Sequence, residues 1–377
     1  MQRYLEKDIQ ADLGEKMVFL WWPRQVGKTT LAQHIWSSAY HSQYTYLNRD
    51  NMQHKKKILQ AEYNTDSTLI ILDEIHKYSG RKNFVKWEYD VKNKELDFLV
   101  TGSARLNVFQ KWWDSLLGRY RYYTLHPYSL AELLDLHPDG WDIQRLLQYG
   151  GFPESYEKSN NRHHTRRVRD RKIRLVREDV RDLTQIKHIG KLELLVSLLE
   201  SKVGSQFSIK SLVEDVQVTH KTLSHRVDVL EHIYYARRLY PLQSTRIKSL
   251  RKEPKLYLRD RSEVQSEWAR IENMVWAHLL KRVHRHRDTE GVDIALHYLR
   301  DREWREVDFV LSQWADITHI IEVKKSSTKI SRHLKYFAKK LSPTHTVQVI
   351  YNIDPEHDVM VDGVRVVSMQ KFLGELK

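Results

Sequence analysis

The sequence has no cysteine among its 377 residues. This absence excludes disulfide bonds, thiol-based catalysis and cysteine-ligated zinc sites. Long apolar runs are also missing, and no stretch approaches the length that crosses a bilayer. The opening residues, Met1, Gln2 and Arg3, do not begin a signal peptide. We therefore expect a cytoplasmic protein that makes no membrane contact.

Negative charge is in short supply relative to positive charge. The chain has 63 lysines and arginines against 49 acidic residues, which gives a formal net charge of +14. Such an excess suits a polyanionic partner such as nucleic acid, although it says nothing about the fold. We find no internal repeat and no low-complexity segment, and the length is sufficient for two or three domains.

The segment from Met17 to Thr30 has the order of a phosphate-binding loop. The apolar run Met17 to Leu20 predicts a buried strand, and Gly27-Lys28-Thr29-Thr30 opens a helix. In such a loop, backbone N–H groups at the helix N-terminus surround phosphate oxygens. We expect Lys28 to reach the β and γ phosphates of ATP and Thr29 to bind Mg²⁺. The expected cradle comprises Trp22, Pro23, Arg24, Gln25, Val26, Gly27, Lys28, Thr29 and Thr30.

Two further apolar runs each end in polar residues that suit nucleotide hydrolysis. Leu69 to Leu72 is apolar throughout, as in a strand buried on both faces, and it ends in Asp73 and Glu74. Ligands in parallel sheets lie at the carboxyl ends of strands, so we expect Asp73 beside the phosphate loop, as a Mg²⁺ partner. Glu74 is the candidate base for the attacking water. Ser103 follows the next apolar strand, Leu96 to Val100, and is expected near the γ phosphate.

Several motifs in this order resemble a known family. They are PRQVGKTT, LIILDEIHK, TGSARL, SLLGRY, LHPYSLAEL and GGFPES. This combination is similar to the AAA-type ATPases that carry a C-terminal domain of the kind called DUF4143. The resemblance implies an AAA+ fold with a P-loop and a three-layer parallel sheet, with Lys28 and Thr29 in Walker A, and with a Walker B pair followed by Ser103 as sensor. It also makes Arg119 a candidate for the arginine that contacts the γ phosphate, with Arg105 as the rival; a surface charge is the simpler interpretation of either.

Tryptophan stands at positions where this family has glycine. Trp22 fills the first glycine position of the phosphate loop, where a Cβ is costly. The same exchange is expected at Trp87, Trp112, Trp113, Trp268 and Trp304, while Arg49, Arg81, Arg259 and Arg261 stand where the family has tryptophan. Only 13 glycines are present. One hypothesis is a gene from a lineage that reads UGA as glycine and some CGN codons as tryptophan; the alternative is a divergent or inactivated loop.

The middle segment contains a dense run of charge and then a helix–turn–helix pattern. The run from Arg162 to Arg181 is interpreted as an exposed helix face with internal ion pairs rather than as a nucleic-acid patch. Ser208 then caps a short helix, and a second helix runs from His220 to Ile233. With the strand that follows, this order fits a winged helix, which either contacts DNA or serves as a packing module. Lys221, Thr222, Ser224 and His225 are the candidates to face a major groove.

The C-terminal segment has an acid–lysine pattern on expected strands. Residues two apart on a strand share a face, so Glu322 and Lys324 point the same way, and Asp308 lies on a neighbouring strand. With Glu272 on an upstream helix, this arrangement resembles the PD-(D/E)XK nuclease core, a restriction-endonuclease-like α/β fold. The resemblance implies that the carboxylates bind Mg²⁺ and that the lysine positions water. A fold retained for recognition alone is the alternative.

We therefore expect an AAA+ ATPase domain over 1–155, a helical winged-helix-like segment over 156–245 and a nuclease-like domain over 246–377, with a DUF4143 region at roughly 165–330. The expected activity is Mg²⁺-dependent ATP binding and hydrolysis. The alternatives are a metal-dependent DNA endonuclease with a regulatory ATPase, a non-catalytic nucleotide-dependent interaction module, and an ATPase made inert by Trp22. The sequence leaves oligomerisation open.

Overall fold

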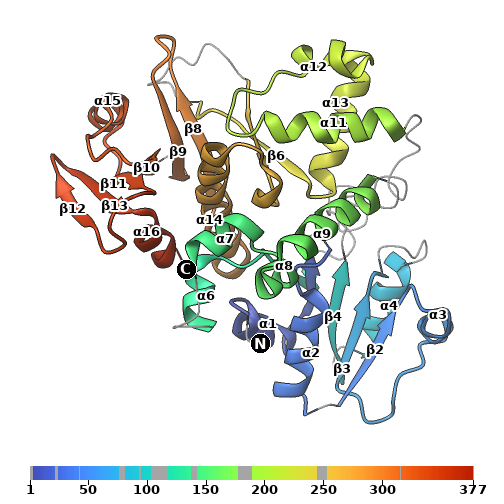
Figure 1. The fold of residues 1–377 in the computed structure, drawn as a ribbon. Coiled ribbons are helices and arrows are strands. Elements are labelled where there is room, and N and C mark those ends of the chain that lie inside the picture. Colours follow the sequence, from blue (N-terminus) through green and yellow to red (C-terminus); the bar gives the residue numbers. More distant parts are fainter. Residues whose placement is uncertain are drawn as a thin grey trace. The chain divides into compact units, whose positions relative to one another are not determined.

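A computed structural model describes residues 3–21, 24–41, 43–75, 81–92, 95–102, 118–136, 142–176, 189–243, 253–314 and 316–376. The chain divides into two compact units (Figure 1). Unit 1 comprises Met1–Pro127 with His232–Tyr234, and unit 2 comprises Tyr128–Glu231 with Tyr235–Lys377.

Unit 1 is built on a parallel sheet of five strands. They are β1 (Met17–Trp21), β2 (Tyr44–Asn48), β3 (Leu69–Asp73), β4 (Asp97–Gly102) and β5 (Tyr120–Thr124). Their order in the sheet is β2-β3-β4-β1-β5, and every pair is parallel. All residues of β1 and β3 are buried, as expected of apolar strands covered on both faces. Polar residues that follow these strands therefore gather at one edge of the sheet.

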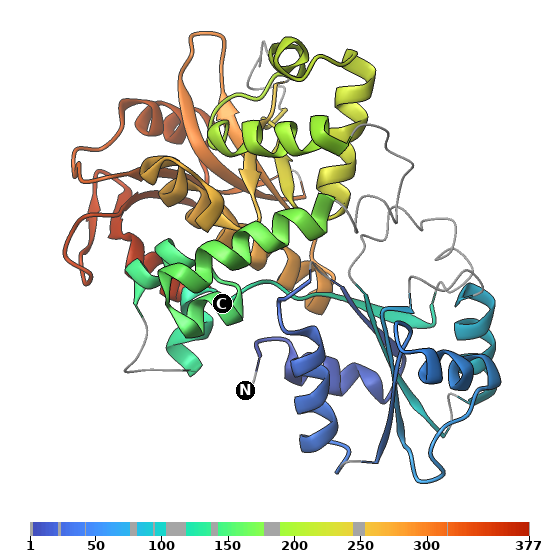
Figure 2. The same cartoon turned by 45° about the vertical axis from the view of Figure 1, so that its right-hand side comes forward.

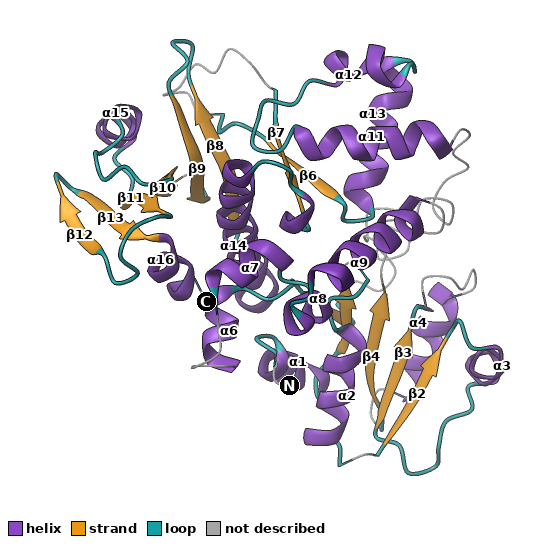
Figure 3. Ribbon diagram, viewed as in Figure 1, coloured by secondary structure: helices purple, strands orange, loops and turns teal. Residues whose placement is uncertain are grey.

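Helices alternate with these strands along the chain (Figure 3). They are α1 (Glu6–Leu13), α2 (Lys28–Ser38), α3 (Met52–Gln60) and α4 (Arg81–Lys92). The strands expected from apolar runs are confirmed, with β1 and β4 slightly longer than predicted. The sequence pattern missed β5, because this edge strand reads YRYYT and is only half-buried at its start. An edge strand with one wet face lacks the continuous apolar run that marked the others.

Unit 2 contains a mixed sheet of six strands. They are β8 (Ile294–Arg300), β9 (Glu306–Gln313), β10 (Asp316–Lys324), β11 (His345–Ile350), β12 (Asp358–Val361) and β13 (Val364–Ser368). The order is β12-β13-β11-β10-β9-β8, with the β10–β11 and β11–β13 pairs parallel and the others antiparallel. The long helix α14 (Glu267–Glu290) contacts β8 (Figure 2). Helices α15 (Arg332–Leu341) and α16 (Met369–Glu375) complete this part.

The remainder of unit 2 is mostly helical. Its helices are α6 (Leu130–Leu136), α7 (Ile143–Tyr149), α8 (Pro153–Lys158), α9 (Asn161–Arg174), α11 (Ile189–Ser201), α12 (Ile209–Val216), α13 (His220–His232) and the 3-10 turn η5 (Arg261–Glu263). Strands β6 (Ala236–Leu239) and β7 (Lys255–Leu258) pair as an antiparallel ribbon. The two helices expected after Ser208 are confirmed as α12 and α13.

The charged helix α9 is not simply an exposed face. Arg167 donates to Asp260 at 2.6 Å, and Arg171 donates to Asp260 at 3.1 Å and to Glu263 at 2.6 Å. All four side chains are buried. The interpretation of this run as a solvated helix with internal ion pairs is therefore wrong for these two arginines, because their partners lie about ninety positions further along the chain.

Candidate functional site

The phosphate-loop segment connects β1 to α2. Strand β1 ends at Trp21, and α2 begins at Lys28. Gly27 caps the helix with a φ of 91°, in the left-handed region that glycine adopts without strain. Lys28 is the first helical residue and is buried. Trp22 and Pro23 lie outside the described residues, while Arg24 to Thr30 lie within them.

Asp73 lies at the end of β3, at the sheet edge where β1 also ends. Its Oδ2 accepts a hydrogen bond from the Thr29 hydroxyl at 3.4 Å. The structure therefore brings Thr29 and Asp73, which are 44 positions apart in the sequence, into direct contact. A hydroxyl beside a carboxylate at a helix N-terminus is the oxygen set that Mg²⁺ uses when it binds with phosphate.

Three further residues that the sequence analysis missed hold the Asp73 carboxylate in place. The Tyr46 hydroxyl donates to it at 2.6 Å, and the Asn48 amide at 3.3 Å. The Thr101 hydroxyl also donates to it. These residues lie on β2 and β4, which flank β3 in the sheet. The sequence could have indicated them only through their position near the carboxyl ends of neighbouring strands, where ligands bind in parallel sheets.

Burial first, and then the bond to Asp73, raise the pKa of the Tyr46 hydroxyl well above its usual range. The Glu74 charge adds to this rise, which means that Glu74 lies close enough to act on the same group. Glu74 itself has a φ of 55°, an unusual conformation for a side chain of its size. Such residues cluster at functional sites, where the surrounding structure holds them.

Arg119, a candidate for the γ-phosphate contact, lies away from the phosphate loop in the described part of the chain. Arg119 immediately precedes β5, and its carbonyl accepts from the Met17 N–H at 3.2 Å, at the start of β1. Its guanidinium pairs with Asp90 at 2.7 Å, and both side chains are exposed. The length of β1, roughly 13 Å, therefore separates Arg119 from the phosphate-loop edge. Its rival Arg105 lies outside the described residues, as do Ser103, Trp112 and Trp113.

The described residues of this edge fit ATP and Mg²⁺. Gly27 provides the tight entry to α2, Lys28 supplies a buried ammonium at the helix start, and Thr29 and Asp73 offer paired oxygens. The helix N-terminus adds partial positive charge, which favours phosphate. The residues that would hold the nucleotide are Arg24 to Thr30, and those that would hold the metal are Thr29 and Asp73.

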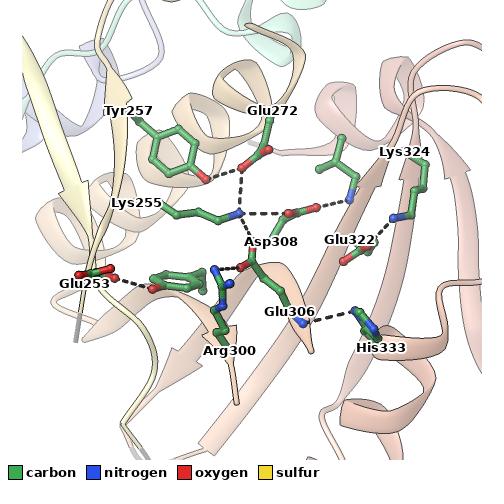
Figure 4. Close-up of polar contacts among 12 residues, drawn as sticks. Glu253, Lys255, Tyr257, Glu272, Arg300, Glu306, Asp308, Glu322, Lys324 and His333 are labelled. Carbon is green, nitrogen blue, oxygen red and sulfur yellow. Dashed lines mark hydrogen bonds and ion pairs between the residues drawn. The ribbon is translucent and has the colours of Figure 1, made fainter. Parts of the chain in front are cut away.

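A second constellation lies in unit 2 and contains the predicted acid–lysine residues (Figure 4). Asp308 extends from β9, and its Oδ2 accepts from the backbone N–H of Val323 on β10 at 2.9 Å. Lys324 donates to Glu322 at 2.6 Å, which confirms that these two side chains share a face. Glu272, on α14, is joined to this group by Lys255, which contacts both Glu272 and Asp308. All four predicted residues are therefore brought into one cluster.

Lys255 lies on β7, and the sequence analysis did not single it out. Its Nζ lies 3.2 Å from Glu272, 2.7 Å from Glu306 and 3.3 Å from Asp308 (Figure 4). Tyr257, two residues further on the same strand face, donates to Glu272 at 2.6 Å. The sequence hint to this pair was local: Lys255 and Tyr257 are two residues apart on a strand, so their side chains share a face.

Burial changes the charge state of this cluster. It raises the pKa of Glu272 to about 7; Lys255 opposes the rise and Asp308 adds to it. Burial, and then the Asp308 charge, likewise raise the pKa of Glu322 to about 7, with Lys324 opposing. The Glu322 Oε2 is buried without a hydrogen-bond partner. Both carboxyl groups therefore hold a proton over a wider pH range than an ordinary glutamate.

The helix–turn–helix residues expected to face DNA lie on α13. Lys221, Thr222 and His225 are exposed, and Ser224 is half-buried. Thr222 forms a 2.9 Å hydrogen bond with Thr219 in the turn. Three of these four side chains are therefore accessible to solvent. Separately, none of the described helices has the length and apolar character needed to cross a membrane.

Comparison with known proteins gives distant relatives. Two uncharacterized proteins, from Mycobacterium bovis and Mycobacterium tuberculosis, are each 26% identical over 247 residues, covering 65% of this chain and 54% of theirs. The chain thus spans about half the length of the curated relatives it matches.

Solved structures give weak likenesses. AMPPCP-bound DnaA from Aquifex aeolicus has a TM-score of 0.34 at 16% identity, covering 60% of this chain and 86% of DnaA. The Thermotoga maritima RuvB Holliday junction branch migration motor has a TM-score of 0.34 at 18% identity, covering 62% of this chain and 87% of RuvB. At these TM-scores the likeness carries no argument.

Family models match successive parts of the chain. Residues 14–134 match AAA_14, described as an AAA domain. Residues 140–265 match DUF8612 and residues 269–372 match DUF4143, both domains of unknown function. The first match contains the whole edge formed by Lys28, Thr29 and Asp73, and the last contains Asp308, Glu322 and Lys324. The chain therefore contains an AAA domain of the P-loop type, followed towards its C-terminus by a DUF4143 domain.

Proposed function

We propose that the protein binds and hydrolyses ATP in a Mg²⁺-dependent reaction at the edge of the five-stranded sheet. The observation that carries this proposal is the 3.4 Å contact between the Thr29 hydroxyl and Asp73, beside the buried Lys28. A lysine and a hydroxyl at a helix N-terminus have little reason to lie beside a carboxylate that is 44 positions further along the sequence unless the three bind a phosphate and its metal.

Each residue has a distinct proposed role. Lys28 neutralises charge on the β and γ phosphates, and Thr29 with Asp73 orients the oxygens that bind the metal. Mg²⁺, when bound, supplies charge neutralisation across the β and γ phosphates. Glu74 accepts the proton of the attacking water, and Ser103 contacts the γ phosphate. Arg119 would serve a γ phosphate only across a subunit boundary, because it lies at the opposite edge of its own sheet.

Replacing Glu74 by glutamine tests this proposal. The variant keeps the size of the side chain but removes the base, so we expect phosphate release to fall about 10²-fold or more while ATP binding is retained. Phosphate release and nucleotide binding are measured on the full chain. Phosphate release unchanged by Glu74→Gln would contradict the role of Glu74, and an absence of release from the parent would favour the non-catalytic module.

Trp22 adds a condition to this test. A tryptophan side chain at the first glycine position of the loop crowds the place where backbone approaches phosphate. We therefore propose that every assay compare the chain as written with the Trp22→Gly variant. Reading the codons distinguishes the two explanations: UGA at position 22 supports misread glycine, and UGG supports a divergent loop.

We also retain a three-part division, with the ATPase domain over 1–155, a winged-helix-like segment over 156–245 and a PD-(D/E)XK-like domain over 246–377. The family matches at 14–134, 140–265 and 269–372 are consistent with this order. In this division, the Asp73 site lies in the ATPase domain and the Asp308–Glu322 cluster lies in the PD-(D/E)XK-like domain.

A second candidate function is metal-dependent DNA cleavage by the C-terminal domain, regulated by the ATPase. The observation that favours it is the cluster of Asp308, Glu322 and Lys324 on adjacent strands, with the Glu322 Oε2 left unpartnered. Two carboxylates would hold Mg²⁺, and Lys324 would position water.

Replacement of Lys324 by alanine tests this second function. We expect any Mg²⁺-dependent nicking of plasmid DNA to be lost, because the ammonium beside Glu322 is removed, while ATP turnover in unit 1 is unchanged. The control is Lys325→Ala, which removes an exposed lysine paired with Glu267. Metal-dependent DNA cleavage that the Lys324→Ala substitution leaves at an unchanged, measurable rate would contradict the assignment.

A further inference from the structure

Four carboxylates surround one small region of unit 2. They belong to Glu272, Glu306, Asp308 and Glu322. Three of them contact the Lys255 ammonium, at 3.2, 2.7 and 3.3 Å. Placing several acidic groups together in a buried region is costly unless a cation lies among them. In this structure Lys255 supplies that cation.

The ammonium of Lys255 fits its surroundings closely. A protonated lysine has three N–H donors, and Lys255 has three carboxylate neighbours, so each donor has its own acceptor. The side chain is only 3% exposed, which leaves no room for exchange with bulk cations while it stays in place. Burial opposes the charge on Lys255, but Tyr257, Glu272, Asp308 and Glu306 outweigh burial and raise its pKa.

A divalent metal cannot share this position. Mg²⁺ takes oxygen ligands at about 2.0–2.1 Å and needs several of them on the same centre. The oxygens of Glu272, Glu306 and Asp308 instead face an ammonium at hydrogen-bonding distances. Within the described part of the chain, no group of three or more acidic or histidine residues is arranged to hold a metal ion. Lys255 and a metal bound by these oxygens are therefore mutually exclusive.

One oxygen remains without a partner. The Glu322 Oε2 makes no hydrogen bond although the residue is only 6% exposed, while its Oε1 accepts from Lys324. The Asp308 charge acts on Glu322, so the two carboxylates are neighbours (Figure 4). This oxygen is therefore available to accept a hydrogen bond or a cation.

Lys255 comes from a different element than the acids around it. It lies on β7, which pairs with β6, whereas Asp308 and Glu322 lie on the six-stranded sheet. The DUF8612 match at 140–265 contains Lys255, and the DUF4143 match at 269–372 contains the carboxylates. The cation is thus contributed by another part of the chain than the carboxylates, from a strand whose residues are all buried.

We propose that Lys255 is an internal cation that takes the place of a divalent metal in the carboxylate cluster. This inference rests on the second candidate function, since it concerns the same carboxylates. Loss of the Lys255 charge would free three carboxylates, which with Glu322 make an oxygen-rich site. We accordingly expect the parent chain to bind no divalent metal at this cluster.

Metal binding to Lys255→Met tests the inference. Methionine keeps much of the length of lysine and removes the charge, so we expect Mn²⁺ to bind at least tenfold more tightly than to the parent. Free Mn²⁺ is measured by electron paramagnetic resonance on the full chain without nucleotide. Every protein also carries Thr29→Ala, so that metal bound at the phosphate loop does not contribute.

A second variant tests the inference even if the Lys255→Met protein does not fold. Removing Lys255 alone leaves buried acids unpaired, so Lys255→Met combined with Glu272→Gln lowers that cost and keeps Glu306, Asp308 and Glu322 as ligands. Adding Asp308→Asn to either variant should abolish the gain in Mn²⁺ affinity. A folded variant without tighter Mn²⁺ binding overturns the inference, and so does a parent that already binds Mn²⁺ in an Asp308-dependent way.

The same samples separate this inference from the nuclease function. Tighter Mn²⁺ binding by Lys255→Met without DNA cleavage keeps the internal cation and rejects the nuclease. Metal-dependent cleavage that appears only in the Lys255 variants supports both. Cleavage by the parent that requires Asp308, at an unchanged rate in Lys255→Met, rejects the internal cation and keeps the nuclease.

Discussion

Replacement of Lys28 by alanine is expected to lower ATP turnover by about 10²-fold or more. Loss of one preorganised charge that contacts the reacting group typically costs ~10²–10³ in kcat. Lys28 is the first residue of α2 and is buried beside the left-handed Gly27, so its side chain starts at the helix N-terminus. No other described lysine occupies that end of the helix.

Phosphate release from the full chain, measured in the Trp22→Gly background as well as in the chain as written, gives the readout. Lys56→Ala is the matched control, because Lys56 is an exposed lysine on α3 in the same unit. We expect the control to keep the parent rate. Turnover by Lys28→Ala at the parent rate would mean that the measured hydrolysis occurs elsewhere.

Asp260→Ala is expected to reduce the free energy of unfolding of unit 2 by about 3–5 kcal/mol, the cost of removing one partner from a buried ion pair. Asp260 accepts from Arg167 at 2.6 Å and from Arg171 at 3.1 Å, and it also accepts from the Ser262 hydroxyl at 2.6 Å. Its loss leaves Arg167 buried without its carboxylate partner. Burial opposes ionisation of Asp260, but the two arginine charges outweigh burial and hold its pKa well below the usual range.

Urea titration followed by hydrogen exchange of α9 peptides measures this loss where it occurs. The control is Asp362→Ala, which removes an exposed ion pair with Lys335 and should change stability little, because solvent screens this pair. Because the folded-state pKa of Asp260 is depressed, its contribution is present above the unfolded-state pKa and is lost as pH falls. Equal effects of the two substitutions would contradict the account of the buried network.

The phosphate-loop edge was predictable because its residues lie at the ends of apolar strands. Lys28, Thr29 and Asp73 each follow a run whose burial the sequence makes plain. Tyr46 carries no motif, Thr101 only begins TGSARL, and their contacts with Asp73 become visible only when the strand order is known. Residues that support a site through neighbouring strands depend on pairing, which a local pattern does not encode.

Arg119 and Lys255 also show that a local sequence pattern does not determine where a side chain lies in the fold. Arg119 follows a glycine in a family motif. Strand β5 runs parallel to β1, however, so Arg119 lies at the amino-terminal end of these strands, away from the phosphate loop at their carboxyl end. Lys255 has no motif, yet the β6–β7 ribbon carries it among Glu272, Glu306 and Asp308. Both outcomes are set by long-range topology rather than by residue type.

The structure supports the hypothesis of misread codons at some of the tryptophan and arginine positions but not at others. Trp304 is 56% exposed and has a φ of 63°, the region that favours glycine. Arg261 is fully buried, and burial lowers its pKa to about 10, which is an unusual setting for an arginine. Trp87 lies within helix α4, where no glycine is required. Codon identity therefore matters most at Trp22 and Trp304.

The central claim is that Lys28, Thr29 and Asp73 meet one triphosphate. Calorimetric titration of ATP with Mg²⁺ into the Trp22→Gly chain, with and without Lys28→Ala, tests it most directly. The account predicts one Mg²⁺-dependent ATP site per chain, weakened at least tenfold by Lys28→Ala. Absence of ATP binding by the folded Trp22→Gly chain, or equal affinity with and without Lys28, would contradict it.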